Sequence, residues 1–165
     1  MDDSRTSILD EIAEDTMKGK FLTFSLGKEF YGIDIFHVTE IVGIQPISVV
    51  PELPHFIRGI INLRGKIIPV MDARAKFNKE NVKYNDRTCI VVVDVSDLSI
   101  GIIVDAVSEV LNIDEDDIVP PPNVGGNGRR YIKSVGMNGN EVILIIDCEQ
   151  LLNLNEIEDL HTINV

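Results

Sequence analysis

The 165-residue sequence contains no tryptophan, only two cysteines and only three histidines. Cys89 and Cys148 lie far apart and form no CxxC motif, which argues against a disulfide framework and against a cysteine-based zinc site. His37, His55 and His161 are each isolated, whereas a structural zinc ion needs about four ligands close together. The sequence therefore predicts no metal site and no cofactor.

Basic residues are also scarce, because 15 lysines and arginines face 27 acidic residues, for a net charge of −12. Nucleic-acid phosphates and anionic membrane surfaces both select clustered Lys and Arg. No apolar stretch is long enough to cross a bilayer, and the acidic start at Met1 lacks the apolar region of a signal peptide. We therefore expect a cytoplasmic protein that binds no nucleic acid and does not insert into the membrane.

Motifs that would indicate catalysis are missing as well. The acidic run Asp114–Asp117 lacks the glycine and glutamate of a calcium loop, because Val119 and Gly125 occupy those positions. The glycine-rich stretch Gly125–Arg130 lacks the Gly-Lys-Ser/Thr of a phosphate-binding loop. There is no GxSxG motif, and nothing in the sequence places a serine, a histidine and an aspartate together, although a dispersed triad stays open. We expect a protein that is not an enzyme.

The sequence does contain many short apolar runs separated by turn signals. Arg64-Gly65 and Asn138-Gly139 each join two such runs and indicate β-hairpins. Asp72 and Asp147 are positioned to cap short helices. A chain of this length suits one domain, and this pattern predicts a mainly β fold with short helices. The predicted strands are 21–24, 30–35, 38–44, 60–63, 66–71, 90–95, 100–104, 107–113, 131–137 and 141–146.

An internal duplication is visible when the sequence is compared with itself. A shift of 69 residues places Gly32–Ile35 on Gly101–Val104. A shift of 75 residues then places Ile68–Asp72 on Ile143–Asp147. Each repeat is near the size at which a lone core is marginal, so the two should pack on each other with a seam between them.

The first twenty residues differ from the rest of the chain. The apolar positions Ile8, Leu9 and Ile12 follow Ser7 and fit a short capped helix, but the surrounding acidic residues fit a frayed tail equally well. We predict an acidic N-terminal extension, a two-part domain whose halves exchange strands, and a tail. Their approximate bounds are 1–19, 20–155 with halves 20–85 and 86–155, and 156–165.

Two features indicate a protein partner. Arg64 lies at the tip of a predicted hairpin, where its planar fork of donors suits an interface, although a plain turn residue also fits. The apolar run Ile41–Ile44 leads into a proline-rich segment that ends at Phe56, as in an edge strand that docks with another protein. Packing into the core of the domain is the alternative explanation for this run.

Several of these segments resemble the chemotaxis coupling protein family CheW. The resemblance implies two intertwined SH3-like five-stranded β-barrels and a scaffold without catalysis, monomeric in isolation. It also implies that the scaffold joins the cytoplasmic tips of methyl-accepting chemoreceptors to the regulatory domain of the histidine kinase CheA, in arrays beneath the membrane. The matching segments span residues 20 to about 155 and are Phe30–Ile35, Val38–Ile41, Phe56–Gly65, Ile67–Asp72, Gly101–Asp105 and Val107–Leu111.

The resemblance also implies three docking surfaces. A receptor hairpin would dock in an apolar groove between the barrels, where we expect Glu40 to pair with Arg64. The implied receptor-binding residues are Ile33, Ile35, Val38, Glu40, Arg64, Gly65, Val104 and Val107. The implied kinase-binding residues are Ile41, Gly43, Ile44 and Phe56. A second contact within the array would involve Val119 and Val124.

Two alternatives stay open at the level of the sequence. The chain could be the coupling module of a larger relative, either the hybrid CheV or CheA itself, although no receiver-like βαβ pattern follows it. It could instead be a β-barrel enzyme or a small-molecule binder that uses the groove between the barrels. A groove whose polar residues are Glu40 and Arg64 alone argues against the second alternative.

Overall fold

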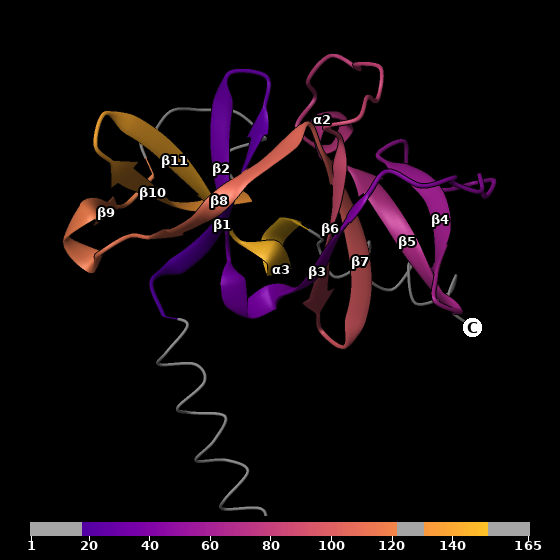
Figure 1. Ribbon diagram of the computed structural model, residues 1–165, viewed down its shortest axis with the longest axis horizontal. Helices are drawn as coiled ribbons and strands as arrows, with labels where there is room; N and C mark the ends of the chain where they lie inside the picture. The colour runs from indigo at the N-terminus through magenta and orange to yellow at the C-terminus, as the bar shows by residue number, and fades with distance from the viewer. Residues whose placement is uncertain (1–17, 122–130, 152–165) are drawn as a thin grey trace, which may run out of the picture.

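The computed structural model of the protein describes residues 18–121 and 131–151. The predicted N-terminal extension up to residue 17, the glycine-rich loop with Val124, and His161 in the tail lie outside the described residues. The described chain is mostly β-strand, which confirms the predicted fold class. Its strands form two sheets that pack against each other (Figure 1).

The six-stranded sheet has the order β8-β1-β2-β11-β10-β9. Its strands are β1 (Lys20–Leu26), β2 (Glu29–Asp34), β8 (Ala106–Asn112), β9 (Ile118–Val119), β10 (Ile132–Asn138) and β11 (Glu141–Ile146). The five-stranded sheet has the order β3-β6-β7-β5-β4. Its strands are β3 (Val38–Gly43), β4 (Ile57–Leu63), β5 (Lys66–Asp72), β6 (Cys89–Val95) and β7 (Leu98–Val104).

Short helices complete the described chain. The 3₁₀ helices are η1 (Ile35–His37) and η2 (Glu115–Asp117), and the α-helices are α2 (Ala73–Lys76) and α3 (Cys148–Leu151). Asp72 caps α2 by accepting hydrogen bonds from the backbone of Arg74 and Ala75. Asp147 accepts hydrogen bonds from the backbone of Glu149 and Gln150 in the same way, so both predicted caps are present.

The two sheets have the same strand order once the two shifts found in the sequence are applied. Strands β1 and β2 then correspond to β6 and β7, β3 corresponds to β8, and β4 and β5 correspond to β10 and β11. Each sheet therefore combines the first two strands of one repeat with three later strands of the other, and the six-stranded sheet adds the short edge strand β9. Both sheets remain open, so the closed barrels implied by the resemblance are not what the strand pairing forms.

Two equivalent glycines allow this close packing. Gly32 pairs with Ile145 across the parallel contact of β2 with β11, and Gly101 pairs with Val70 across the parallel contact of β7 with β5. A Cβ atom on Gly101 would lie 2.6 Å from the Ile90 side chain and 2.9 Å from that of Val70. A Cβ on Gly32 would lie 3.1 Å from the Ile143 side chain, so the repeat preserves a glycine at two tightly packed positions and Gly101 is the tighter of the two.

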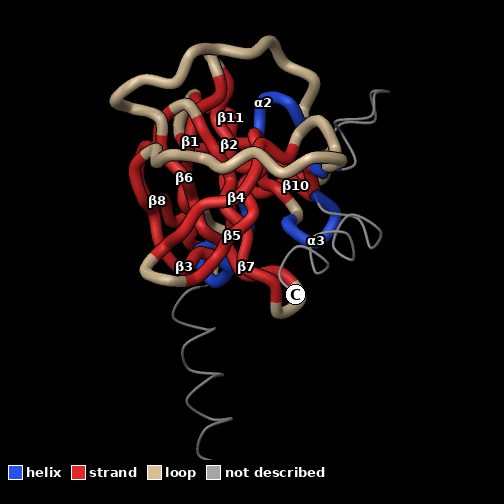
Figure 2. Tube along the Cα trace, turned by 90° about the vertical axis from the view of Figure 1, so that its right-hand side faces the viewer, coloured by secondary structure: helices blue, strands red, loops and turns tan. Residues whose placement is uncertain are grey.

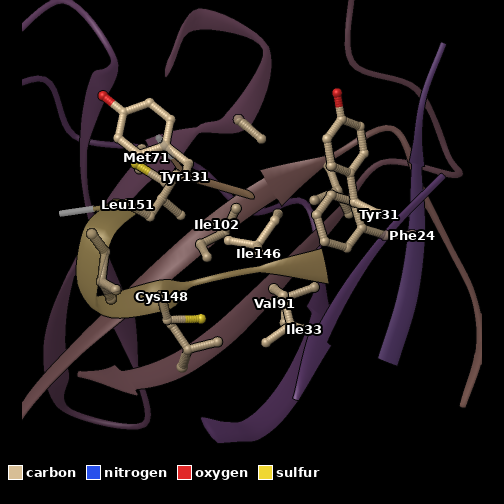
Figure 3. Close-up of a cluster of buried hydrophobic side chains, with 14 of the residues drawn as sticks. Phe24, Tyr31, Ile33, Met71, Val91, Ile102, Tyr131, Ile146, Cys148 and Leu151 are labelled. Carbon is tan, nitrogen blue, oxygen red and sulfur yellow. The ribbon is translucent and has the colours of Figure 1, made fainter. Parts of the chain in front are cut away.

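Most of the buried apolar side chains lie between the two sheets. This central core takes residues from both sheets and from α2 and α3, among them Phe24, Tyr31, Val91, Ile102 and Ile146 (Figure 3). Each sheet also has a smaller core on its other face. The smaller core of the five-stranded sheet is Ile61, Leu63, Ile68, Val70, Ile90, Val92 and Ile103, and that of the six-stranded sheet is Phe21, Ile113, Ile143 and Ile145.

An ion pair joins the two sheets at the crossover from β7 to β8. The Arg74 guanidinium donates to both carboxylate oxygens of Asp105, from Nε at 2.8 Å and from Nη2 at 2.6 Å. The Gly27 backbone, in the turn between β1 and β2, donates to the same carboxylate at 2.8 Å. The Arg74 hydrogen bond is the main cause that lowers the pKa of Asp105 below its ordinary value of 3.8.

We expect Asp105→Asn to lower the free energy of unfolding at pH 7 by about 2 kcal/mol, because it breaks a charge-assisted, two-point contact. A carboxyl whose pKa is lowered on folding stabilises the protein above its ordinary pKa and loses that contribution as the pH falls through the folded value. The difference between wild type and variant should therefore shrink below about pH 4. Urea unfolding at pH 7 and pH 3 measures it, and an equal difference at both values would contradict the assignment.

Candidate protein-docking site

The β4–β5 hairpin presents Arg64 at a rigid tip. Arg64 and Gly65 both have left-handed backbones, with φ of 53° and 87°, as a two-residue hairpin turn requires. The Asn62 side chain accepts a hydrogen bond from the Gly65 backbone at 2.8 Å and braces the turn. The Arg64 side chain is 71% exposed, so most of it is available to a partner.

Arg64 pairs with Glu40, as expected from the sequence. Its Nη2 atom lies 2.5 Å and 2.7 Å from the two Glu40 carboxylate oxygens. These hydrogen bonds and the attraction of the carboxylate raise the pKa of Arg64. Because Glu40 lies on β3 and the hairpin begins with β4, the pair connects the two edge strands of the five-stranded sheet.

A short backbone contact also brings these two edges together. The Ser48 and Ile60 backbones exchange N–H···O=C hydrogen bonds of 2.9 Å each, which attaches the segment after β3 to β4. Gly59, beside Ile60, has φ of 149°, and a Cβ there would lie 2.1 Å from the Ser48 carbonyl oxygen. The edge strands β3 and β4 are thus linked by the Ser48–Ile60 backbone bridge and the Arg64–Glu40 ion pair, and not by continuous strand pairing.

A β-bulge sets the direction of the β3 side chains. Val38 lies opposite Val93 and Glu40 lies opposite Val92, so one extra residue is inserted between the two pairs. Beyond the bulge, Ile41 lies opposite Val91, which belongs to the central core. Directly opposed residues share a face of the sheet, so Val38 and Ile41 both face the central-core side.

The equivalent strand β8 repeats this arrangement. Val107 lies opposite Phe24 and Val110 lies opposite Leu22, with a register shift between them. Both partners belong to the central core, so Val107 and Val110 also face its side. Ile41 is 43% exposed and Val110 is 49% exposed. Figure 2 shows β3 and β8 on one side of the molecule and α2 and α3 on the other.

Six of the predicted receptor residues, Ile35, Val38, Glu40, Arg64, Gly65 and Val107, lie on accessible parts of this side or at the Arg64 hairpin. Ile35, Val38 and Val107 are half-buried at the margin of the central core. Ile33 and Val104 differ, because they are 0% and 1% exposed inside that core and offer no surface to a partner. Both belong to the central core against which Ile35, Val38 and Val107 pack. We call the accessible set Ile35, Val38, Ile41, Val107 and Val110 the β3–β8 face.

The four predicted kinase residues do not form one surface. Gly43 is exposed at the end of β3, and Ile44 packs against the smaller core of the five-stranded sheet. Ile41 belongs to the β3–β8 face instead, and Phe56 is 7% exposed in the central core. The segment after Ile44 carries Val49, which is 82% exposed and was not singled out in the sequence.

Of the two residues predicted to make the second contact within the array, Val119 is 47% exposed on the edge strand β9. Sequence reasoning also missed Val110 and the exposed Phe36 of η1. The shift of 69 residues places Ile41 on Val110, so the repeat could have indicated that Val110 belongs with Ile41. No pattern in the sequence indicated that Phe36 is exposed.

The described residues 18–121 and 131–151 contain no group of three His, Cys, Asp or Glu side chains that could hold a metal ion. Within the same residues, no helix has the length and apolar character needed to cross a membrane. Both cysteines have free thiols, and burial raises the pKa of the Cys148 thiol to about 12. That thiol is therefore a poor nucleophile at neutral pH.

Comparisons with known proteins agree on one family. The CheW-like domain family model matches residues 20–156. Chemotaxis protein CheW of Klebsiella aerogenes is 37% identical over 147 residues, covering 88% of this chain and 89% of that protein. CheW of Treponema pallidum is 34% identical over 146 residues, covering 86% of each. The crystal structure of the scaffolding protein TtCheW from Thermoanaerobacter tengcongensis matches with a TM-score of 0.78 and 40% identity, covering 84% of this chain and 94% of that one.

Proposed function

This chain belongs to the CheW-like domain family and is a chemotaxis coupling adaptor, and we propose that it links methyl-accepting chemoreceptors to the histidine kinase CheA. It acts without catalysis, in the cytoplasm, as a monomer that joins arrays with its partners. The observation that carries the proposal is the presence of two separate accessible surfaces, the β3–β8 face that spans both sheets and the far end of β3 in the five-stranded sheet. Binding at both surfaces lets the state of the receptor bias the state of the kinase through binding free energy.

The β3–β8 face with the adjoining Arg64 hairpin is the proposed receptor surface. Its side chains are apolar and partly exposed, which suits the apolar stripe of a helical hairpin. Arg64 supplies a planar cationic fork at the edge of this face, oriented by Glu40. Ile41 is assigned to the receptor surface and not to the kinase surface. The bulge in β3 supports this, because it turns the Ile41 side chain to the same face as Val38.

The proposed kinase surface is the end of the five-stranded sheet, where Gly43 and Ile44 lead into the segment that contains Val49. This surface lies on the same strand as part of the receptor surface but at its far end. Val119 on β9 is the proposed second contact within the array, at the edge of the other sheet.

Val49→Asp should weaken binding of the kinase regulatory domain by about tenfold, because it places a charge at an exposed apolar contact. Its stability should stay within about 0.5 kcal/mol of wild type, since the side chain is almost fully exposed. Calorimetric titration measures the affinity. Val82→Asp is the matched control, an exposed valine in the loop between α2 and β6. Equal affinities for the two variants would remove Val49 from the kinase surface.

A further inference from the structure

The two sheets are joined covalently at two crossovers, which run from β2 through η1 to β3 and from β7 to β8. These crossovers lead directly into the two strands of the β3–β8 face. Away from the β3–β8 face, α2 and α3 pack against the central core (Figure 2), although Arg74 of α2 also reaches back to Asp105 at the β7–β8 crossover. Two packed layers that are tethered along one side keep a fixed angle only if the contact on the other side is also fixed. The contacts of α2 therefore bear on the geometry of the β3–β8 face.

The last residue of α2 is a buried lysine that touches aromatic rings from both sheets. Lys76 is 6% exposed, although lysine is among the residues least often buried. Its ammonium nitrogen lies 3.9 Å from the centre of the Phe56 ring and 5.0 Å from the centre of the Tyr131 ring. Phe56 immediately precedes β4 of the five-stranded sheet, and Tyr131 immediately precedes β10 of the six-stranded sheet. Both distances are within the range of cation–π attraction.

A row of stacked rings continues from this lysine across the central core. Phe77, the next residue after Lys76, meets the Tyr131 ring at 5.8 Å and 61°. Its ring also stacks on Tyr31 of β2 at 5.3 Å and 11°. Tyr31 in turn stacks on Phe24 of β1 at 5.6 Å and 13°. The ring of Phe77, the residue that caps α2, is thus inserted between the rings of Tyr31 and Tyr131, and Lys76 connects that row to Phe56.

We propose that Lys76 is a positioning residue for the proposed receptor surface. Its ammonium holds Phe56 and Tyr131 in one arrangement, which fixes the angle between the sheets and so the separation of β3 from β8 on the far side. An apolar side chain of similar length would fill the same space, but it would lack the attraction that ties both ring faces to one point. The proposal rests on the proposed function for the identity of the partner, but not for the geometry of the sheets.

The test compares Lys76→Met, which keeps the length and removes the charge, with Lys76→Arg, which keeps a cation that binds ring faces. Lys83→Met is the control, an exposed lysine in the loop before β6. The full chain is used throughout. Residual dipolar couplings in NMR give the relative orientation of the two sheets in each variant. Titrations give the affinity for a receptor cytoplasmic fragment and for the kinase regulatory domain, and urea unfolding gives the stability.

We expect Lys76→Met to fold, to change the orientation of the sheets and to bind the receptor fragment about tenfold more weakly, within the range of a desolvated cation–π contact. Its kinase affinity should match that of Lys83→Met, because the proposed kinase surface lies within one sheet. Lys76→Arg should restore both the orientation and the receptor affinity. Phe56→Leu, which removes a ring and keeps an apolar side chain, should reproduce the effect of Lys76→Met and replaces that variant if it does not fold.

The proposal is overturned if Lys76→Met leaves the sheet orientation unchanged. It is also overturned if both affinities fall in parallel with the stability, since that result describes a purely structural residue. If the wild-type protein binds neither partner, the proposed function fails, and the orientation measurement alone then decides the role of Lys76.

Discussion

Arg64→Glu should lower the affinity for a receptor cytoplasmic fragment by about 30-fold, a loss typical of a central interface residue. The substitution reverses the charge of the most exposed group at the proposed receptor surface. It also places a second carboxylate beside Glu40, where the hydrogen bonds of 2.5 Å and 2.7 Å now lie. The fold should persist, because the side chain is exposed and the turn is braced by Asn62 and Gly65. Sedimentation with the fragment measures the loss.

A double variant separates two ways in which Arg64 could act. Glu40→Arg combined with Arg64→Glu restores the ion pair across the sheet edges but exchanges the positions of the charges. If Arg64 contacts the receptor directly, the double variant should bind as weakly as Arg64→Glu. Recovered binding would show instead that the pair acts only by holding the edges together. Unchanged binding by Arg64→Glu itself would remove the residue from the receptor surface.

Gly59→Ala should destabilise the protein by about 3 kcal/mol, the upper part of the range for overpacking. The added Cβ would lie 2.1 Å from the Ser48 carbonyl oxygen and 2.8 Å from its carbonyl carbon. These are backbone atoms, so no side-chain rotation relieves the contact. The φ of 149° is also one that non-glycine residues rarely adopt. We expect the bridge between Ser48 and Ile60 to break, and urea unfolding measures the loss.

Gly43→Ala is the matched control in the same sheet. A Cβ at Gly43 has no neighbour within 4 Å, and its φ lies outside the left-handed region. Its stability should change by less than about 0.5 kcal/mol, with any change toward a more stable protein because alanine restricts the unfolded chain. Equal effects of the two substitutions would contradict the role of Gly59 as the point of closest backbone approach.

The sequence predicted the elements of the fold well because each has a local cause. Apolar runs between turn residues located the ten main strands, and Asp72 and Asp147 located the two α-helices that follow β5 and β11. The repeat of Gly32 as Gly101 predicted two similar half-domains that pack on each other. The turn at Arg64-Gly65 formed where expected, because Gly65 readily adopts the left-handed backbone that a tight hairpin needs, and Arg64 adopts it beside this glycine.

The assignment of side chains to surfaces depended on features that a local pattern does not contain. The bulges in β3 and in the β1–β8 pairing reverse the simple alternation of faces, which moves Ile41 to the β3–β8 face. Phe56 follows a proline-rich edge segment, yet its ring turns into the central core beside Lys76. That contact joins residues from two sheets, so no pattern within either segment could indicate it.

The duplicated architecture also explains how one small domain offers separate contacts. Equivalent edge strands β3 and β8 place Ile41 and Val110 at corresponding positions. The two sheets differ at the proposed receptor surface, because in the described residues the Arg64–Glu40 pair has no equivalent among the ion pairs of the six-stranded sheet. A symmetric framework with asymmetric side chains thus suits the proposed binding of two unlike proteins.

The most direct test of the coupling role is co-sedimentation of the protein with a receptor cytoplasmic fragment, with and without the CheA kinase. Wild type should pellet with the receptor and carry the kinase with it. Arg64→Glu should leave both proteins in the supernatant as a soluble adaptor–kinase complex, whereas Val49→Asp should pellet without the kinase. If the kinase pellets equally well when the adaptor is omitted, or if both variants lose the same partner, the account of two separate docking surfaces is contradicted.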